Sequence, residues 1–308
     1  MSRRPRAAVD VGTNSVRLLV VDGDGRRRCR ELTITRLGAG VDRTGHLDDA
    51  ALERTLEAIA AYRRRWESLG VDGAVRIAAT SAVRDAADRD RFFTGVRRVA
   101  GIDAEVLTGD EEAALAYAGV VAGVDVPAPV AVVDVGGGST EIIVGDPEGR
   151  VAASTSLQLG CVRITERCLV DDPPSDAQLA AAEAEIEARL AEADAALAAA
   201  PLTTAATLVA VAGTATTLAA LDRDLAAYDE DAVHGAWVSA ASLDALTRRL
   251  VRLRASERAE LGPVQPGRED VIHGGALVLR AVLRRAGAPG LVVSEADNLD
   301  GLAASIGS

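Results

Sequence analysis

Short apolar runs alternate along this chain with longer segments in which apolar residues recur every three or four positions. Residues 48–68 show the second pattern, with Leu52, Leu56 and Ile59 forming a stripe that begins after an aspartate and ends before Gly70. Asp48 or Asp49 can cap a helix here, and the glycine can end it. The segment therefore predicts an amphipathic helix.

The same pattern gives the other elements and their order. Ser175 and Gln178 form a capping box at the start of an alanine- and glutamate-rich helix that extends to about residue 200. Strands are predicted at 75–79, 104–107, 208–211 and 291–293, and helices after residue 109 and over most of 239–286. Strands that alternate with helices predict the α/β fold class.

An internal repeat organises the chain. Residues 7–22, AAVDVGTNSVRLLVVD, align with residues 131–146, AVVDVGGGSTEIIVGD, at an offset of 124, and eight of the sixteen positions are identical. Each copy predicts a β-hairpin with a small-residue turn. The repeat indicates a duplicated α/β domain whose two turns face each other across a cleft. Residues 121–129, VAGVDVPAP, contain the glycine and prolines typical of a linker between domains. We therefore expect domains at 1–125 and 126–308.

Composition excludes several function classes. The chain has 308 residues, 48% hydrophobic and 26% charged, which is enough to bury sizeable cores. Aromatic residues are only 2% and the net charge is −12, so we expect no nucleic-acid partner. All 34 basic residues are arginine. The lack of lysine excludes a P-loop lysine and Schiff-base chemistry, and the three separated histidines exclude an HExxH zinc site.

Cysteine usage and hydropathy bear on the compartment. Cys29, Cys161 and Cys168 make an odd count without a CxxC pair, which favours a reducing compartment and no disulfide framework. Asp10 interrupts any apolar region of a signal peptide, and the apolar runs are shorter than a membrane span. We therefore expect a cytoplasmic protein with no membrane partner.

The two hairpin turns carry the strongest chemical signal. Each places an aspartate, Asp10 or Asp134, before small residues whose backbone N–H groups can face an anion. The carboxylate would act through a divalent cation or a water. A single turn of this kind is more simply a tight hairpin, but the matched pair favours phosphate binding. Arg17 and Glu141 occupy equivalent positions, which suggests an arginine for substrate oxygens and a glutamate for metal or water; ordinary exposed hairpin residues are the alternative.

Three further segments contribute candidates. In TGDEEA, Glu112 could orient or deprotonate a water, although acidic residues in a first helical turn are also simple caps. Arg84 follows a strand and could bind phosphate, or could lie on the surface. GTATTL, from Gly213, predicts a turn between strand and helix, and PGRED is expected to open a helix with Arg268 in its first turn. A cation there is unfavourable, which suggests an anionic partner.

These motifs resemble the exopolyphosphatase / guanosine pentaphosphate phosphohydrolase (Ppx/GppA) family of the actin–Hsp70–sugar kinase (ASKHA) superfamily. The resemblance runs from AAVDVGTNSVRLLV through ATSAVRDA, TGDEEA, VVDVGGGSTE, SLQLGCVRITE, GTATTLAAL and PGRED to LVVSEADNLDGLAAS. It implies two RNase H-like domains that flank an interdomain cleft. The chain departs from the family pattern at SEADNLDG, where many relatives have SDxGLRDG with an arginine.

The resemblance also assigns roles to residues. It implies that Glu112 activates the attacking water and that Glu141 supports magnesium and water. It implies Mg²⁺ near Asp134 and Glu141, and the matched first turn adds Asp10 as an expected metal ligand. The residues expected to bind phosphate are Gly12, Thr13, Asn14, Ser15, Arg17, Arg84, Gly136, Gly137, Gly138, Ser139, Thr140, Gly213, Thr214 and Arg268.

The expected reaction is hydrolysis of a terminal phosphoanhydride bond. Polyphosphate is favoured, of short chain length because the family's C-terminal extension is lacking, with guanosine pentaphosphate as an alternative substrate. A homodimer is expected. A sugar kinase of the same superfamily and a non-catalytic alarmone or nucleotide sensor remain open at this point.

Overall fold

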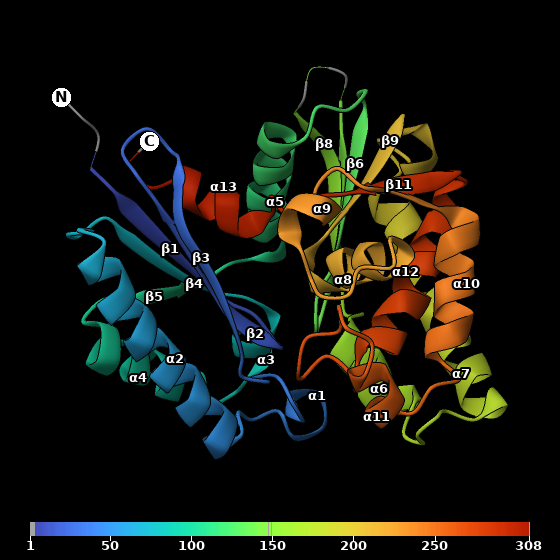
Figure 1. The fold of residues 1–308 in the computed structure, drawn as a ribbon, viewed down its shortest axis with the longest axis horizontal. Coiled ribbons are helices and arrows are strands. Elements are labelled where there is room, and N and C mark those ends of the chain that lie inside the picture. The colour runs from blue at the N-terminus through green and yellow to red at the C-terminus, as the bar shows by residue number, and fades with distance from the viewer. Residues whose placement is uncertain (1–3, 147, 149, 308) are drawn as a thin grey trace. The chain divides into compact units, whose positions relative to one another are not determined.

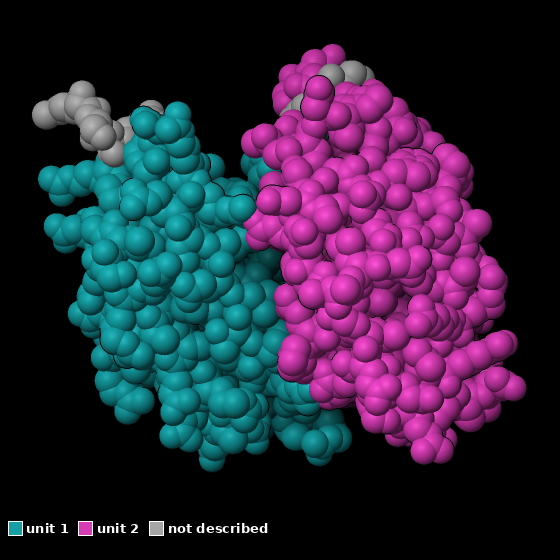
Figure 2. All heavy atoms as spheres, in the orientation of Figure 1, with its two compact units in different colours: residues 1–119, 298–308 teal, residues 120–297 magenta. Residues whose placement is uncertain are grey.

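The computed structural model describes residues 4–146, 148 and 150–307, which form two compact units (Figure 2). Unit 1 comprises residues 1–119 and 298–308, and unit 2 comprises residues 120–297. The boundary falls inside helix α5 (Gly109–Gly123), so the first part of the predicted junction 121–129 is helical. The chain end also differs from the expected 126–308 domain, because residues 298–308 pack in unit 1.

Unit 1 is built on a five-stranded mixed sheet. Its order is β3-β2-β1-β4-β5, in which β1 pairs antiparallel with β2 and parallel with β4. The strands are β1 (Arg6–Val11), β2 (Ser15–Val21), β3 (Arg27–Ile34), β4 (Val75–Ala79) and β5 (Ala104–Val106). The β1–β2 pairing confirms the first predicted hairpin, and β4 confirms the predicted strand 75–79 exactly in its bounds.

Helices cover both faces of this sheet (Figure 1). Val9 and Val11 pack with residues of α2 (Asp49–Ser68) and α4 (Asp90–Ala100), whereas Ala8 and Leu19 pack with Leu299 of α13 (Asn298–Ala304). Side chains alternate between the faces of a strand, so Asp10 and Arg17 lie on the same face as α13. The helices α1 (Val41–Thr44) and α3 (Ser81–Asp85) complete the unit.

The predicted helix at 48–68 is confirmed together with its cap. The Asp48 carboxylate accepts a hydrogen bond from the Ala51 backbone N–H at 2.9 Å, which satisfies one of the unpaired donors of the first turn. Gly70 follows the helix at a φ of +79°, a conformation that glycine adopts without strain.

Unit 2 is built on a six-stranded mixed sheet of order β10-β11-β9-β6-β7-β8. The antiparallel β6–β7 pair confirms the second predicted hairpin. The strands are β6 (Val130–Val135), β7 (Thr140–Gly145), β8 (Val151–Leu157), β9 (Thr207–Val211), β10 (Trp237–Ser239) and β11 (Gly290–Val293). Because β6, β7 and β9 are buried along their length, their apolar residues are nearly continuous rather than alternating.

The helices of unit 2 bury their apolar residues against the sheet and against one another. Its larger helices are α6 (Cys161–Cys168), α7 (Asp176–Ala196), α8 (Ala212–Asp222), α10 (Ala240–Leu250) and α12 (Ile272–Ala286). Short turns complete it: η1 (Leu202–Thr204), α9 (Glu230–Val233) and α11 (Ala255–Ala259). The capping box of Ser175 and Gln178 is present at the start of α7. None of the described helices combines the length and the apolar character that crossing a bilayer requires.

Two local predictions were wrong. Gly213 to Leu218 do not form a turn, because α8 begins at Ala212, directly after β9, and includes them in its first turns. Arg268 does not lie in the first turn of a helix, because α12 begins at Ile272. The PGRED segment instead forms turns in which the Arg268 carbonyl accepts from the N–H groups of Val271 and Ile272.

Candidate functional site

The two hairpin turns have the same backbone geometry. In the first, the Gly12 N–H donates to the Ser15 carbonyl at 2.9 Å, and in the second the Gly136 N–H donates to the Ser139 carbonyl at 3.0 Å. Further on, Asp22 and Asp146 each accept two backbone N–H groups with Oδ1. The duplication seen in the sequence is therefore also present in the hydrogen bonds of the two turns and of the two aspartates that follow them.

Neighbouring segments fix the first turn in place. The Thr13 hydroxyl contacts that of Ser81 at 2.8 Å, and the Thr13 carbonyl accepts from the Gly38 N–H at 2.8 Å. The Asn14 carbonyl accepts from the N–H groups of residues 35 and 36. A side chain at Gly38 would overlap Thr13, so glycine is required for this approach. Thr13 and Asn14 are consequently almost fully buried.

Asp10 and Arg17 form an ion pair across the first hairpin. They are directly opposite each other in the β1–β2 register. Arg17 donates to Asp10 Oδ2 from Nε at 3.0 Å and from Nη2 at 2.7 Å. Asp10, a predicted metal ligand, therefore has one carboxylate oxygen occupied by a guanidinium in this structure.

The second turn is held by the start of α6. The carbonyls of Gly136 and Gly137 accept from the N–H groups of Cys161 and Val162, each at 2.9 Å. Arg163 Nε donates to the Gly138 carbonyl at 2.7 Å. In a trans peptide the C=O and N–H point in opposite directions. The N–H groups of residues 137–139 therefore point away from α6, the orientation that an anion-binding loop requires.

Close packing at Gly160 makes this arrangement tight. A Cβ on Gly160 would overlap the Gly137 carbonyl, which is backbone and could not move aside. The Thr140 hydroxyl donates to the Leu159 carbonyl at 2.6 Å and is fully buried. Thr140 thus supports the loop from within, and Ser139 is buried as well, at 3% exposed.

Asp134 and Glu141 place two buried carboxylates side by side. They are directly opposite each other on β6 and β7 and are 5% and 1% exposed. The Ser156 hydroxyl donates to Glu141 Oε1 at 2.7 Å. The equivalent positions of unit 1 hold an acid and a base, so the duplicated sites differ by two charges. Burying two like charges together is costly without a cation nearby.

Glu111 and Glu112 have different surroundings at the start of α5. Glu111 Oε2 accepts from both the N–H and the hydroxyl of Thr108 at 2.9 Å, and these bonds lower the pKa of its carboxyl group. Glu112 is 5% exposed, and its Oε2 accepts from Arg84 Nη1 at 3.3 Å. Arg84 also donates to the Leu107 carbonyl at 3.0 Å. Glu111 therefore caps the helix, and Glu112 is the buried carboxylate beside an arginine.

Arg268 lies against the first turn of α8. A Cβ on Gly213 would overlap its guanidinium, and the Thr214 hydroxyl donates to the Val135 carbonyl at 3.3 Å. The guanidinium and the helix N-terminus bring two centres of positive charge together, an arrangement that an anion stabilises. The misplaced cation inferred from the sequence therefore exists, but at α8 rather than at α12.

Sequence reasoning missed four residues that shape these loops: Gly38, Gly160, Arg163 and Asn298. The glycines lie in segments without a turn signature, and Asn298 is 288 positions from the aspartate that it contacts. Gly160 and Arg163 belong to SLQLGCVRITE, a segment that contributes to the family resemblance but whose individual residues carry no sequence signal of their role.

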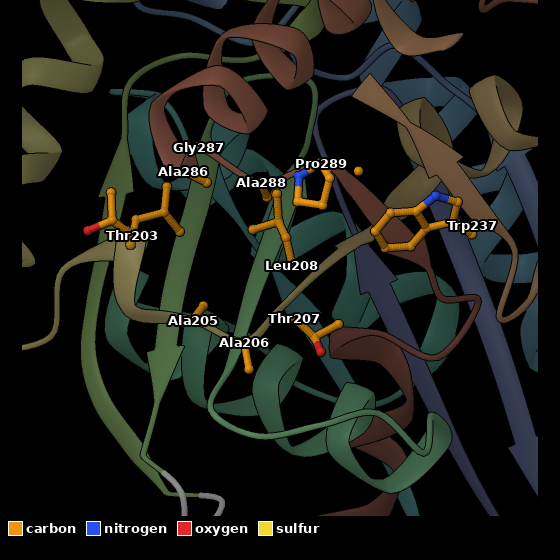
Figure 3. A pocket seen from close by; sticks show the side chains of 12 residues that line it. Thr203, Ala205, Ala206, Thr207, Leu208, Trp237, Ala286, Gly287, Ala288 and Pro289 are labelled. Carbon is orange, nitrogen blue, oxygen red and sulfur yellow. The ribbon is translucent and has the colours of Figure 1, made fainter. Parts of the chain in front are cut away.

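A cavity of about 210 Å³ opens elsewhere on unit 2 (Figure 3). Small and apolar side chains from residues 202–208 and 286–290 line it together with the half-exposed Trp237. None of the predicted site residues lines this cavity. Among the residues that the structure describes, no cluster of three or more His, Cys, Asp or Glu side chains could hold a metal ion.

Comparisons with known proteins identify the family of the chain and its fold. The model of the Ppx/GppA phosphatase family matches residues 27–295. A Mycobacterium tuberculosis protein named exopolyphosphatase 2 is 45% identical, over 97% of this chain and 98% of that protein. A Vibrio atlanticus guanosine-5'-triphosphate,3'-diphosphate pyrophosphatase is 36% identical, over 54% of this chain and 33% of that protein. The crystal structure of an exopolyphosphatase-like protein matches with a TM-score of 0.92 at 36% identity, over 98% of both chains, which confirms the predicted fold class.

Proposed function

The chain belongs to the Ppx/GppA phosphatase family, and we propose that it is an exopolyphosphatase that hydrolyses the terminal phosphoanhydride bond of inorganic polyphosphate. The observation that carries the proposal is the environment of Glu112. It is a buried carboxylate fixed by Arg84, while the adjacent Glu111 performs the capping that its position in the helix would otherwise explain. A buried carboxylate that an arginine holds beside a helix start is suited to proton transfer.

Glu112 would act as the general base. It accepts a proton from a water whose oxygen attacks the terminal phosphorus in line. The P–O bond to the bridging oxygen breaks, the terminal group leaves as orthophosphate, and the bridging oxygen becomes the new end of the shortened chain. Arg84 holds the carboxylate in one orientation, which keeps the base in position for the water.

Phosphate oxygens would be bound by the loop N–H groups and by arginine. The N–H groups of residues 137–139 and the first turn of α8, with Arg268 against it, offer fixed donors and positive charge. Such pre-oriented groups stabilise charge that develops in a phosphoryl transition state without reorganising during the reaction.

Magnesium is part of this proposal. Asp134 and Glu141 are two adjacent buried carboxylates, and oxygen ligands of this kind fit Mg²⁺, which binds through one or two carboxylates plus waters and phosphates. When bound, the ion would neutralise charge on the phosphate oxygens. Asp10 fits less well, because Arg17 occupies its Oδ2.

We favour short polyphosphate chains, a homodimer and a cytoplasmic location as further parts of the proposal. The net charge of −12 repels a long polyanion beyond the local contacts, which supports the preference for short chains. Guanosine pentaphosphate is the second candidate substrate, supported by the 36% identity to the Vibrio pyrophosphatase over half of this chain.

A phosphate-release panel tests the function. Tripolyphosphate, longer polyphosphates, guanosine pentaphosphate, ATP and ADP are assayed with and without Mg²⁺. We expect the highest kcat/KM with short polyphosphate and Mg²⁺. Release that requires guanosine pentaphosphate supports the second candidate, and binding without release from any substrate overturns both.

A further inference from the structure

Asn298, the first residue of α13, contacts both members of the Asp10–Arg17 pair. Its Oδ1 accepts from Arg17 Nη2 at 2.5 Å, and its Nδ2 donates to Asp10 Oδ1 at 3.4 Å. Arg17 donates in turn to Asp10 Oδ2. The three side chains therefore form a closed triangle of hydrogen bonds, in which Asp10 and Asn298 are each 4% exposed.

We propose that Asn298 is a positioning residue that holds Arg17 in the orientation in which it binds a substrate phosphate. A guanidinium is planar, and its donors point in fixed directions. Asp10 and Asn298 contact its Nε and Nη2, so both help to fix the plane of the guanidinium. The inference rests on the proposed function, because it takes the partner of Arg17 to be a phosphate oxygen.

The amide is a suitable second partner for this purpose. A second carboxylate would hold the guanidinium between two negative charges and would compete with a phosphate for it. An apolar residue would remove the acceptor of Arg17 Nη2 and the donor to Asp10 Oδ1 that the amide supplies. An amide satisfies one donor of Arg17 and one acceptor of Asp10 without adding charge.

Helix α13 is a rigid support for Asn298. Leu299 and Leu302 are buried in the apolar cluster on the β1–β2 face, and Asp300 pairs with Arg30 at 2.9 Å. A Cβ on Gly301 would overlap the Leu115 carbonyl, so α13 packs directly on α5, the helix that carries Glu112 in its first turn (Figure 1). The same helix thus contacts the arginine and the element that carries the proposed base.

Steady-state kinetics with tripolyphosphate test the proposal. Asn298→Leu keeps similar volume but removes both hydrogen bonds. We expect KM to rise about five- to tenfold, less than for loss of a direct charge-assisted contact because Arg17 itself remains, with kcat within about twofold. Asp300→Asn is the matched control, because it removes the Arg30 ion pair from the same helix and leaves the Asn298 amide in place. We expect its KM to be unchanged.

An exchange of roles provides a rescue test. Asp10→Asn leaves Arg17 between two amides and should raise KM. The double variant Asp10→Asn/Asn298→Asp again gives Arg17 one carboxylate and one amide, with their places reversed, and should recover a large part of the lost affinity. A double variant that is worse than either single variant overturns the proposal, since it would mean that Asp10 acts by itself.

A readout without turnover separates this inference from the proposed function. The ¹⁵N signal of the Arg17 Nε–H, identified by its loss in Arg17→Lys, should exchange slowly in wild type and in Asp300→Asn but fast in Asn298→Leu. That pattern supports the role of Asn298 in holding Arg17 even if the phosphate-release panel shows no activity. An unchanged signal with unchanged KM in Asn298→Leu overturns it, and so does an equal loss of Tm and activity in Asn298→Leu and Asp300→Asn, which would assign Asn298 a structural role only.

Discussion

Two adjacent glutamates at the start of α5 differ in what surrounds them, and this difference decides their chemistry. Glu111 is exposed and bonded to Thr108, whereas Glu112 is buried and bonded to Arg84. The two bonds from Thr108 stabilise the charged form of Glu111 and commit its Oε2 to the helix cap, whereas Glu112 Oε2 is bonded to an arginine side chain. The pKa of Glu111 is accordingly lowered.

Replacement of Glu112 should therefore abolish turnover and preserve binding. Glu112→Gln is nearly isosteric and keeps an acceptor for Arg84, but it cannot take a proton from water. We expect kcat to fall by at least about a hundredfold, the lower range of general-base effects, with a KM or Kd for tripolyphosphate within a few-fold of wild type.

The matched control for Glu112→Gln is the same substitution at the neighbouring residue, Glu111. Glu111→Gln removes the charge from the cap and should lower Tm slightly while activity persists. Near-normal turnover in Glu112→Gln would exclude it as the base and leave Glu111 or Glu141 as the candidates.

Arginine substitutions test the phosphate contacts. Arg17→Ala, Arg84→Ala and Arg268→Ala should each lower kcat/KM by about ten- to a hundredfold, the equivalent of roughly 1.5–3 kcal/mol for a charge-assisted contact. Each should also weaken the salt dependence of KM, because fewer charged contacts remain to be screened. Arg84→Ala should lower kcat as well, since it releases Glu112.

The control for these variants is Arg63→Ala. Arg63 lies on the surface of α2 and pairs with Glu67 in the next turn. Its loss should change neither KM nor the salt dependence. An equal effect at Arg63 would indicate diffuse electrostatic steering rather than a defined phosphate site.

At the scale of secondary-structure elements, the hairpins and the capped helices could be predicted because their signals are local. Asp48 and Ser175 precede apolar stripes at helical spacing, and the capping bonds lie within three residues. The start of α8 could not be predicted in this way. Gly213 is a poor helix former, and it is tolerated there because the Arg268 guanidinium occupies the space that a side chain would need.

Gly213→Ala should consequently act through Arg268. In an ordinary helix this change would stabilise by about 1 kcal/mol. Here the new methyl group would displace the guanidinium, whose flexible stem can move aside. We expect a folded protein with a raised KM similar to that of Arg268→Ala, and a double variant no worse than either single one. Additive losses in kcat/KM would show that Gly213 and Arg268 act separately.

Helix α12 contains a buried histidine that makes stability depend on pH. His273 is 2% exposed, its Nδ1 has no hydrogen-bond partner in the described structure, and burial lowers its pKa to about 3. In the unfolded chain the imidazole binds a proton near pH 6.5, whereas in the folded protein it stays neutral until about pH 3. The free energy of unfolding is therefore unaffected by this group above pH 6.5 and declines as the pH falls from 6.5 toward 3.

The change between pH 7 and pH 5 can be measured. One such group should cost roughly 2 kcal/mol of unfolding free energy over this interval. Urea unfolding of wild type and His273→Gln at both pH values isolates it, because the variant lacks the titrating group. An equal decline in the two proteins would mean that His273 binds a proton in the folded state.

At the scale of the whole molecule, the net negative charge of the protein opposes binding of a negatively charged substrate, so local positive groups at the loops must attract it. Acidic residues outnumber arginines by 46 to 34, yet the proposed substrate is a polyanion. Local features can attract its terminal phosphates, and these are the features that the repeat made visible in the sequence. Contacts such as Asn298 on Arg17 remained hidden, because they join segments 281 positions apart and have no periodic signature.

Repulsion between the negatively charged protein and the polyphosphate predicts how salt changes the preference for chain length. Terminal phosphates bind the loops in short and long substrates alike, so salt weakens those contacts equally in both. Distal phosphates of a long chain face the net negative field of the protein, whose range shrinks from about 30 Å at 0.01 M to about 10 Å at 0.1 M salt. The ratio of kcat/KM for a chain of about a hundred phosphates to that for tripolyphosphate should therefore rise across this interval. Phosphate-release kinetics at a series of salt concentrations measure it, with Mg²⁺ held constant. A ratio that falls would mean that the distal chain meets a basic surface, and the preference for short chains would then have to come from the shape of the site.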